Sequence, residues 1–190
     1  EKVKLLHSCV YNIDKEITIT AGATQAIFTV LAALVKKDDE VLIFTPAYDC
    51  YEPIIELFGG KTRAVQLEAP FYKPNWEKVE DQINNNTKLI IINTPHNPSG
   101  AVFSKDDLLQ LQKLTEKYDL FVLSDEVYEH IIFDQQIHYS VSKFRALSKR
   151  SFVVASFGKT FHNTGWKIGY CLAPEPLMNE FKKVHQYNVF

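Results

Sequence analysis

The sequence predicts an α/β domain with a doubly wound, mostly parallel sheet and helices on both faces. Three observations lead to this fold class. Short apolar runs alternate along the chain with segments that are apolar at helical spacing. The apolar runs are continuous rather than alternating, which is typical of strands covered on both faces of a parallel sheet. The chain has 190 residues, of which 46% are hydrophobic, so it is long enough for one sizeable core.

In the first half of the chain, turn signals separate the expected elements. Thr45-Pro46 ends one apolar run, Gly59-Gly60 stops a helical pattern, and Asn93-Thr94-Pro95 ends a second apolar run. The elements expected here are a helix over 23–37, a strand over 41–44, a helix over 51–58, a strand over 62–67, a helix over 76–83 and a strand over 89–92. Such alternation of strands and helices predicts parallel strands joined by crossover helices.

The second half of the chain continues the same alternation. Ser104 and Asp107 form a capping box that opens a helix running to Tyr118. The elements expected after it are a strand over 120–123, a helical segment, a strand over 152–155 and a helix that is still continuing at 188–190. The whole chain is therefore expected to form a single layered domain.

Polar side chains follow three of the predicted strands. Asn97 comes after the strand over 89–92, Asp125 and Tyr128 after 120–123, and Ser156 and Lys159 after 152–155. Taken singly, these residues also suit a turn, a helix cap, a phenol at the rim of the core, or a surface lysine. Taken together they predict a site, because ligands of open α/β sheets bind at the carboxyl ends of the strands.

The start of the helix over 23–37 is a fourth candidate element. Gly22, Ala23 and Thr24 offer free backbone amides and a hydroxyl, which suit an anion such as phosphate. An ordinary helix cap, with Gln25 reaching back to the chain before it, is equally compatible with this pattern. The two interpretations do not exclude each other.

Composition argues against several other classes of protein. The net charge of −2 favours neither nucleic acid nor an anionic membrane as a partner, and the apolar stretches are too short to span a bilayer. No signal-peptide pattern lies near residues 1–4. The three cysteines are scattered and the six histidines lack ligand spacing, so neither a disulfide framework nor a metal site is expected. A reducing, cytoplasmic location fits best.

The lysine has one rival interpretation. Ser156 and Lys159 match the S-x-x-K motif of penicillin-recognising serine enzymes, and Ser124-Asp125-Glu126 imitates their S-D-N. In those enzymes the motif opens a buried helix, whereas here a strand leads into it and Gly158 lies inside it. No separate K-T-G strand follows, so this interpretation is rejected.

Several motifs, all in order along the chain, carry a family resemblance. They are Ala21-Gly22-Ala23-Thr24, Tyr48-Asp49-Cys50-Tyr51-Glu52-Pro53, Asn93-Thr94-Pro95-His96-Asn97-Pro98, Ser124-Asp125-Glu126-Val127-Tyr128, Ser156-Phe157-Gly158-Lys159 and Thr164-Gly165-Trp166-Lys167-Ile168-Gly169-Tyr170. The set resembles the fold-type-I, class I/II aminotransferases, which use pyridoxal 5′-phosphate (PLP). Residues 128–131 and 183–187 are most similar to the methionine and kynurenine (glutamine transaminase K) branch. The resemblance implies that residues 1–190 are part of the PLP-binding large domain, without the N-terminal arm and the C-terminal small domain.

The resemblance also implies a role for each matching residue. Lys159 would hold PLP as a Schiff base, would be buried for that reason, and would later carry a proton. Asp125 would pair with the pyridine nitrogen. The other implied contacts are Tyr128 and Asn97 at the phenolic oxygen, Tyr48 against the ring, and Ala23, Thr24, Ser156 and Lys167 at the phosphate. Tyr48 and Asn97 would also contact substrate, and Lys167 replaces an arginine found in many relatives.

The implied activity is transfer of the amino group of hydrophobic, sulfur-containing or aromatic L-amino acids, such as methionine, to a 2-oxo acid. A cysteine-S-conjugate β-lyase and a non-catalytic PLP-sensing domain of a transcription regulator stay open as alternatives. The resemblance further implies a homodimer and cis peptides at Asn97-Pro98 and Thr45-Pro46. Tyr72, Phe103 and Tyr139 are expected at the rim of the site, and Trp166 is expected to pack in the protein rather than take part in chemistry.

Overall fold

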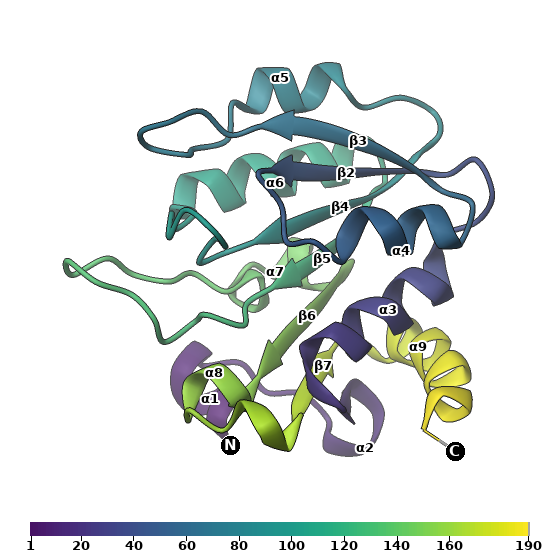
Figure 1. The fold of residues 1–190 in the computed structure, drawn as a ribbon, viewed down its shortest axis with the longest axis vertical. Helices are drawn as coiled ribbons and strands as arrows, with labels where there is room; N and C mark the ends of the chain where they lie inside the picture. Colours follow the sequence, from purple (N-terminus) through teal and green to yellow (C-terminus); the bar gives the residue numbers. More distant parts are fainter. Residues whose placement is uncertain (190) are drawn as a thin grey trace.

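The fold is known from a computed structural model, which describes residues 1–189. A single sheet of seven strands runs through it in the order β1-β7-β6-β5-β4-β2-β3 (Figure 1). The strands are β1 (Ile17–Thr20), β2 (Glu40–Thr45), β3 (Lys61–Gln66), β4 (Thr87–Asn93), β5 (Phe121–Asp125), β6 (Ser151–Ser156) and β7 (Gly169–Leu172). The pairs β2·β3, β2·β4, β4·β5 and β5·β6 are parallel, whereas β7 is antiparallel to both β6 and β1. The predicted doubly wound, mostly parallel sheet is confirmed.

Helices cover both faces of this sheet. They are α1 (Lys2–His7), α2 (Ile13–Glu16), α3 (Gly22–Leu34), α4 (Tyr51–Leu57), α5 (Trp76–Asp81), α6 (Lys105–Lys117), α7 (Arg145–Ser148), α8 (Phe157–Thr160) and α9 (Glu175–Asn188), with short 3-10 turns η1 (Val141–Lys143) and η2 (Thr164–Trp166). In Figure 1, α3, α4 and α9 lie on the near face, and α6 and α7 lie behind the sheet. No helix within residues 1–189 is both long enough and apolar enough to cross a bilayer.

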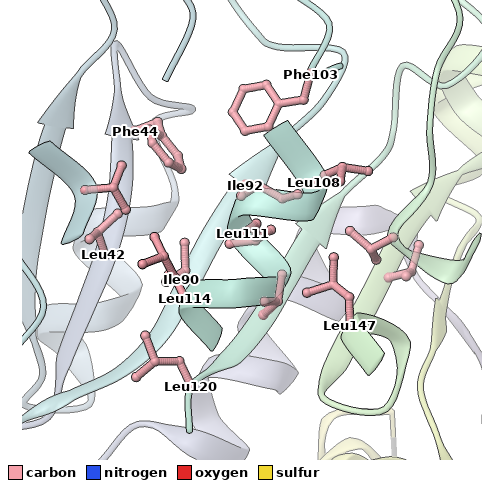
Figure 2. Close-up of a cluster of buried hydrophobic side chains, with 14 of the residues drawn as sticks. Leu42, Phe44, Ile90, Ile92, Phe103, Leu108, Leu111, Leu114, Leu120 and Leu147 are labelled. Atoms are coloured by element: carbon pink, nitrogen blue, oxygen red, sulfur yellow. The ribbon is translucent and has the colours of Figure 1, made fainter. Parts of the chain in front are cut away.

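The continuous apolar runs have the physical basis that the sequence predicted. Successive side chains of a strand point to opposite faces, and β4 divides its isoleucines accordingly. Ile90 and Ile92 pack with the leucines of α6, whereas Ile91 packs with α3. Figure 2 shows the first of these layers, in which the leucines of α6 lie over Ile90 and Ile92 of β4, with Leu42 and Phe44 of β2 at the left. The central strands β4, β5 and β6 are therefore almost wholly buried, and polar chemistry is available at their ends.

The predicted strand positions all hold, with ends that differ by one or two residues. Two strands at one edge, β1 and β7, were missed because each has only four residues. The helical segment expected between β5 and β6 is wrong for most of its length. Residues 126–140 form a loop, since Glu126 and His138 pair within it at 3.0 Å and are both buried. Only η1 and α7 are helical there.

Four X-Pro peptide bonds within residues 1–189 are cis. They include both predicted bonds, Thr45-Pro46 and Asn97-Pro98, together with Ala69-Pro70 and Thr94-Pro95. The expected C-terminal helix is α9, which reaches Asn188; Phe190 lies outside the described residues.

Candidate active site

The strand register brings the candidate residues to one edge of the sheet. Asn93 of β4 lies level with Asp125 of β5. On the other side, Ser156 of β6 lies level with Gly169 of β7, which in turn lies level with Thr20 of β1. Because β7 is antiparallel, β1 runs in the same direction as β6, and α3 begins at the same edge. The two strands that the sequence did not predict therefore place the α3 helix start in the site.

A cavity of about 220 Å³ opens at this edge. All nine residues that the sequence singled out line it: Ala23, Thr24, Tyr48, Asn97, Asp125, Tyr128, Ser156, Lys159 and Lys167. They come from six separate segments of the chain. The strand-end argument predicted that Asn97, Asp125, Tyr128, Ser156 and Lys159 would meet. The other four were expected from the helix start (Ala23, Thr24) or from the family resemblance (Tyr48, Lys167). Asn93 and Thr164 also line the cavity and were not predicted as site residues.

Asp125 is the buried charge of the cavity, with 4% of its surface exposed. Its Oδ2 accepts a hydrogen bond from the Tyr51 hydroxyl at 2.6 Å, and its Oδ1 accepts one from the Val127 amide at 3.2 Å. Burial raises the pKa of Asp125 to about 6, although these two donors oppose the shift. Within residues 1–189 no cation forms an ion pair with it. A buried carboxylate that has only neutral donors is a place where a cationic ligand gains binding energy.

Tyr51 is a site residue that sequence reasoning missed. Its side chain is buried, and burial together with the Asp125 charge holds its pKa well above the usual value. The hydroxyl therefore stays protonated and acts as a donor. The ring of Tyr48 meets it edge-on at 5.8 Å between centroids, and the Tyr48 hydroxyl lies 3.5 Å from Thr24 Oγ1. The spacing of the two tyrosines by one helical turn was the available signal.

A buried scaffold holds Asn97 at the cavity. The Asn93 amide donates to the Asp125 carbonyl at 3.0 Å, and Asn93 Oδ1 accepts from the Asn97 amide at 2.7 Å. His96 Nε2 donates to the Pro46 carbonyl at 2.9 Å, which leaves Nδ1 to accept from Ser99 at 2.7 Å. Burial lowers the pKa of His96, so the neutral ring bridges two loops.

The start of α3 combines both interpretations that the sequence left open. Gln25 does reach back, and its Oε1 accepts from the Ala21 amide at 2.6 Å. No side chain caps the next amides, which face the cavity side of the helix start. Gly169 makes this close approach feasible: a Cβ there would lie 2.6 Å from the Gly22 carbonyl carbon and 2.8 Å from the Ala23 nitrogen.

The two lysines of the cavity lie at its rim. Lys159 follows β6 on α8 and is exposed, so the expected burial of this residue is wrong for the described chain. The reason is its place in the short helix at the open edge of the sheet. Its Nζ lies 5.9 Å from the centre of the Tyr128 ring. Lys167, also exposed, adopts the left-handed conformation with φ 52° at the end of η2.

Three expectations about neighbouring residues need correction. Phe103 is 2% exposed and belongs to the core, where its ring contacts Phe44 and Trp76 edge-on, rather than to the rim. Tyr72 and Tyr139 pack against the same core cluster and do not line the cavity. Trp166 is 75% exposed and packs against little in the described chain.

The residues of the cavity suit a particular ligand chemistry. At one side the buried Asp125 carboxylate would favour a cationic ring nitrogen. Free amides and hydroxyls of the α3 start, Ser156 and Lys167 suit a phosphate. Tyr48 offers a flat apolar surface, and Lys159 offers an amine that can form a bond to a carbonyl group. The set fits PLP, which has a ring nitrogen, a phosphate, a flat aromatic ring and a carbonyl group.

The fold and this cavity define an α/β domain of the aminotransferase type. The family model of aminotransferase class I and II matches residues 3–190. The chain therefore belongs to the class I and II aminotransferases, a family whose members depend on PLP.

Individual relatives agree with the family assignment. The chain is 45% identical to methionine aminotransferase of Escherichia coli K12, over all of its own length and 49% of that protein. It is 35% identical to human kynurenine–oxoglutarate transaminase 3, over 93% of the chain and 41% of that protein.

Solved structures give the same result. YbdL from Escherichia coli, described as having a methionine aminotransferase function, superposes with a TM-score of 0.97 at 45% identity, over 99% of this chain and 50% of that one. The aromatic aminotransferase of Pyrococcus horikoshii superposes with a TM-score of 0.94 at 37% identity, over 98% of this chain and 50% of that one. The chain thus spans about half the length of the curated relatives it matches.

Proposed function

We propose that the protein is a PLP-dependent aminotransferase that moves the amino group of a hydrophobic, sulfur-containing or aromatic L-amino acid to a 2-oxo acid. We also propose that residues 1–190 are part of its cofactor-binding large domain. One observation carries the proposal. Nine residues from six segments line one cavity, and they include a lysine at the rim and a buried carboxylate that pairs with no cation within residues 1–189. The names of the relatives support a methionine-like substrate.

The proposed holding contacts follow from the chemistry of each group. The Asp125 carboxylate pairs with the ring nitrogen, and Tyr48 lies against the ring. Tyr128 and Asn97 donate to the phenolic oxygen, and Asn97 and Tyr48 also contact substrate. Ala23, Thr24, Ser156 and Lys167 bind the phosphate. When bound, PLP supplies an electron sink for the electrons of a broken bond at the substrate Cα.

Lys159 is the proposed catalytic base. Its Nζ would anchor the cofactor covalently and, as a free amine, would accept the proton from the substrate Cα. The Tyr128 ring lies close to this amine, with its centre 5.9 Å from Nζ. Burial, Asp125 and Tyr48 raise the pKa of Tyr128, so its phenol remains a hydrogen-bond donor at neutral pH.

The test is the Lys159→Ala substitution in the intact protein. Wild type should show the visible absorption band of lysine-bound cofactor, should lose it when methionine is added, and should form a new amino acid from the 2-oxo acid. Lys159→Ala should abolish the lysine-bound band and turnover, whereas Lys105→Ala, an exposed lysine on α6, should retain both. A wild-type protein without this band would refute the proposal. Release of pyruvate and ammonia from a cysteine conjugate, without a new amino acid, would indicate β-elimination instead.

We further propose that the protein is a cytoplasmic homodimer. The exposed Trp166 and Phe161 lie beside the cavity-lining segment, where a second subunit would cover them. All three cysteines are free thiols, which is consistent with a reducing compartment. Sedimentation of the intact protein, compared with a Trp166→Glu variant, tests the dimer.

A further inference from the structure

The turn that carries Asp125 and Tyr128 has a second side, which faces away from the cavity. Glu126 and Glu129 lie in the same turn, and both are buried with 1% and 6% of their surface exposed. Neither lines the cavity. Together with Lys2, His7, His138 and Tyr170 they form a group that we call the rear cluster.

Glu129 is the centre of the rear cluster. It forms an ion pair with Lys2, and His7 Nε2 donates to its Oε2 at 2.9 Å. The Tyr170 hydroxyl donates to Oε1 at 3.3 Å. Burial alone would raise the pKa of Glu129, but the hydrogen bonds and charges of His7 and Lys2 lower it to about 2. Two residues of α1 thus hold a carboxylate that immediately follows Tyr128.

Lys2 also contacts the segment that carries the proposed catalytic lysine. Its Nζ lies 5.4 Å from the Phe157 ring centre and 5.1 Å from the Tyr170 ring centre, within range of cation–π attraction. Phe157 opens α8 two residues before Lys159. One ammonium group therefore connects the Tyr128 turn to the Lys159 helix.

A metal site is the competing interpretation of this group. Ligand-type atoms of His7, Glu126 and Glu129 all lie within 4.8 Å of one another. However, the Lys2 ammonium already lies on the Glu129 carboxylate, and a divalent cation would meet that like charge at short range. Glu126 is satisfied separately by Ser124, Val141 and His138. The cluster is therefore better explained as a set of ion pairs that holds the Tyr128 turn against α1 than as a metal site. We call its three central residues, Lys2, His7 and Glu129, the clamp.

We propose that Lys2, His7 and Glu129 act as positioning residues that fix Tyr128 and Lys159 relative to each other from behind the cavity. This inference rests on the proposed function. Loosening the clamp would weaken the hydrogen bond from Tyr128 to the phenolic oxygen of the cofactor. That bond favours the unprotonated form of the lysine-bound cofactor, so its apparent pKa should rise when the clamp is broken.

The experiment titrates the visible band of the intact holoprotein against pH in wild type, Glu129→Gln, Lys2→Met and the double variant. Each single change should raise the apparent pKa of the band by about half to one unit, because a weakened bond to a charged group corresponds to a shift of that order. The dissociation constant of the cofactor should rise about 3- to 10-fold, because the same hydrogen bond is weakened. The double variant should show little further change, since both residues belong to one interaction.

Two further variants separate positioning from a merely structural role. Lys2→Arg keeps the charge and should restore the wild-type band pKa. Lys4→Met removes an exposed lysine of the same helix and should leave the band unchanged. If Glu129→Gln fails to fold, Lys2→Met still decides the matter, since the Lys2 side chain is 21% exposed and tolerates replacement more easily.

The outcomes are distinct for the inference and for the proposed function. Folded Lys2→Met protein with the wild-type band pKa and cofactor affinity would overturn the clamp and leave the proposed function intact. Wild-type protein without a lysine-bound band would overturn both. A band pKa that changes on treatment with a chelator in wild type would replace the clamp by a metal site.

Discussion

Asp125 and Glu129 are two buried carboxylates four residues apart whose pKa values shift in opposite directions. Asp125 faces the cavity, where the described residues give its carboxylate hydrogen bonds only from the neutral Tyr51 hydroxyl and the Val127 amide, and burial raises its pKa to about 6. Glu129 faces the rear cluster, where Lys2 and His7 lower its pKa to about 2 against the effect of burial. The same turn thus carries one charge without a cation and one charge that is fully paired.

The difference shows which side of the turn is available for a ligand. A buried charge without a counterion destabilises the folded chain, and a cation that binds there recovers that energy. A charge that is already paired offers no such gain. We therefore expect a ligand to bind at the front of the turn, and we propose that the rear adds rigidity.

The largest effect is expected for Asp125→Asn. Without the carboxylate nothing in the cavity holds a positive charge on the cofactor ring, and kcat should fall by about 10²–10³-fold or more. The same variant should be more stable than wild type when free of cofactor. Asp125 binds its proton more tightly in the folded state, with a pKa of about 6 against an ordinary 3.8. Folding stability therefore falls as pH rises from about 4 to 6, and the asparagine escapes this loss.

Urea unfolding of the cofactor-free protein at pH 7.5 measures the second part of this prediction. The gain should be about 1–3 kcal/mol, from a pKa shift of about two units at 1.36 kcal/mol each. Asp81→Asn, an exposed aspartate at the end of α5, is the control and should change neither quantity. A destabilised Asp125→Asn protein would mean that the front carboxylate is compensated after all.

The second prediction concerns the rear side and has the opposite sign. Glu129 has a folded-state pKa of about 2 against an ordinary 4.5. The contribution of the Glu129 charge to the free energy of unfolding is fully present above pH 4.5. It is lost as the pH falls from about 4.5 to 2, and the loss is about 3 kcal/mol. Lys2→Met should remove a large part of this acid dependence, measured by urea unfolding between pH 2.5 and 6. Equal acid dependence in wild type and Lys2→Met would show that Lys2 does not hold the Glu129 charge.

The same two sides explain what the sequence could predict. The front residues stand directly after apolar strands, and strand ends meet at one edge by a general rule, so Asn97, Asp125, Tyr128 and Lys159 could be found from local pattern. The rear cluster joins Lys2 and His7 to Glu129 over more than 120 residues. No local pattern records such a contact. It depends on where α1 docks, which follows from tertiary packing alone.

The missed strands follow the same logic. Ile17–Thr20 and Gly169–Leu172 are too short for a periodicity signal. Gly169–Leu172 pairs with β6, and Ile17–Thr20 becomes a strand by pairing with it. The exposure of Lys159 and Trp166 was likewise beyond the sequence pattern. An apolar strand leading into a residue predicts where the residue lies, but not what covers its side chain.

The third prediction tests how the front carboxylate is tuned. Tyr51→Phe removes the 2.6 Å donor to Asp125 Oδ2, and the pKa of Asp125 should rise by about one further unit above 6, a roughly tenfold change in its protonation equilibrium. The infrared carbonyl band of protonated Asp125, identified by its loss in Asp125→Asn, measures this pKa in the cofactor-free protein. Tyr48→Phe is the matched control, since the Tyr48 hydroxyl lies beside Thr24 rather than Asp125. An unchanged Asp125 pKa in Tyr51→Phe would place the tuning elsewhere.

The smallest effect is expected for Lys167→Arg at the rim of the front side. Lys167 is exposed, unlike Lys2, and water screens its charge, so its contact with a phosphate should contribute little. Arginine keeps the charge and adds a planar fork that can bind two phosphate oxygens at once. Cofactor affinity should therefore improve about 2- to 5-fold, by the value of roughly one exposed hydrogen bond to a charged group. Equilibrium dialysis at 50 and 200 mM salt measures it, with Lys167→Met expected to weaken binding and to reduce its salt dependence. An affinity that is equal in all three proteins would mean that the phosphate is held by the α3 amides and Ser156 without help from the rim.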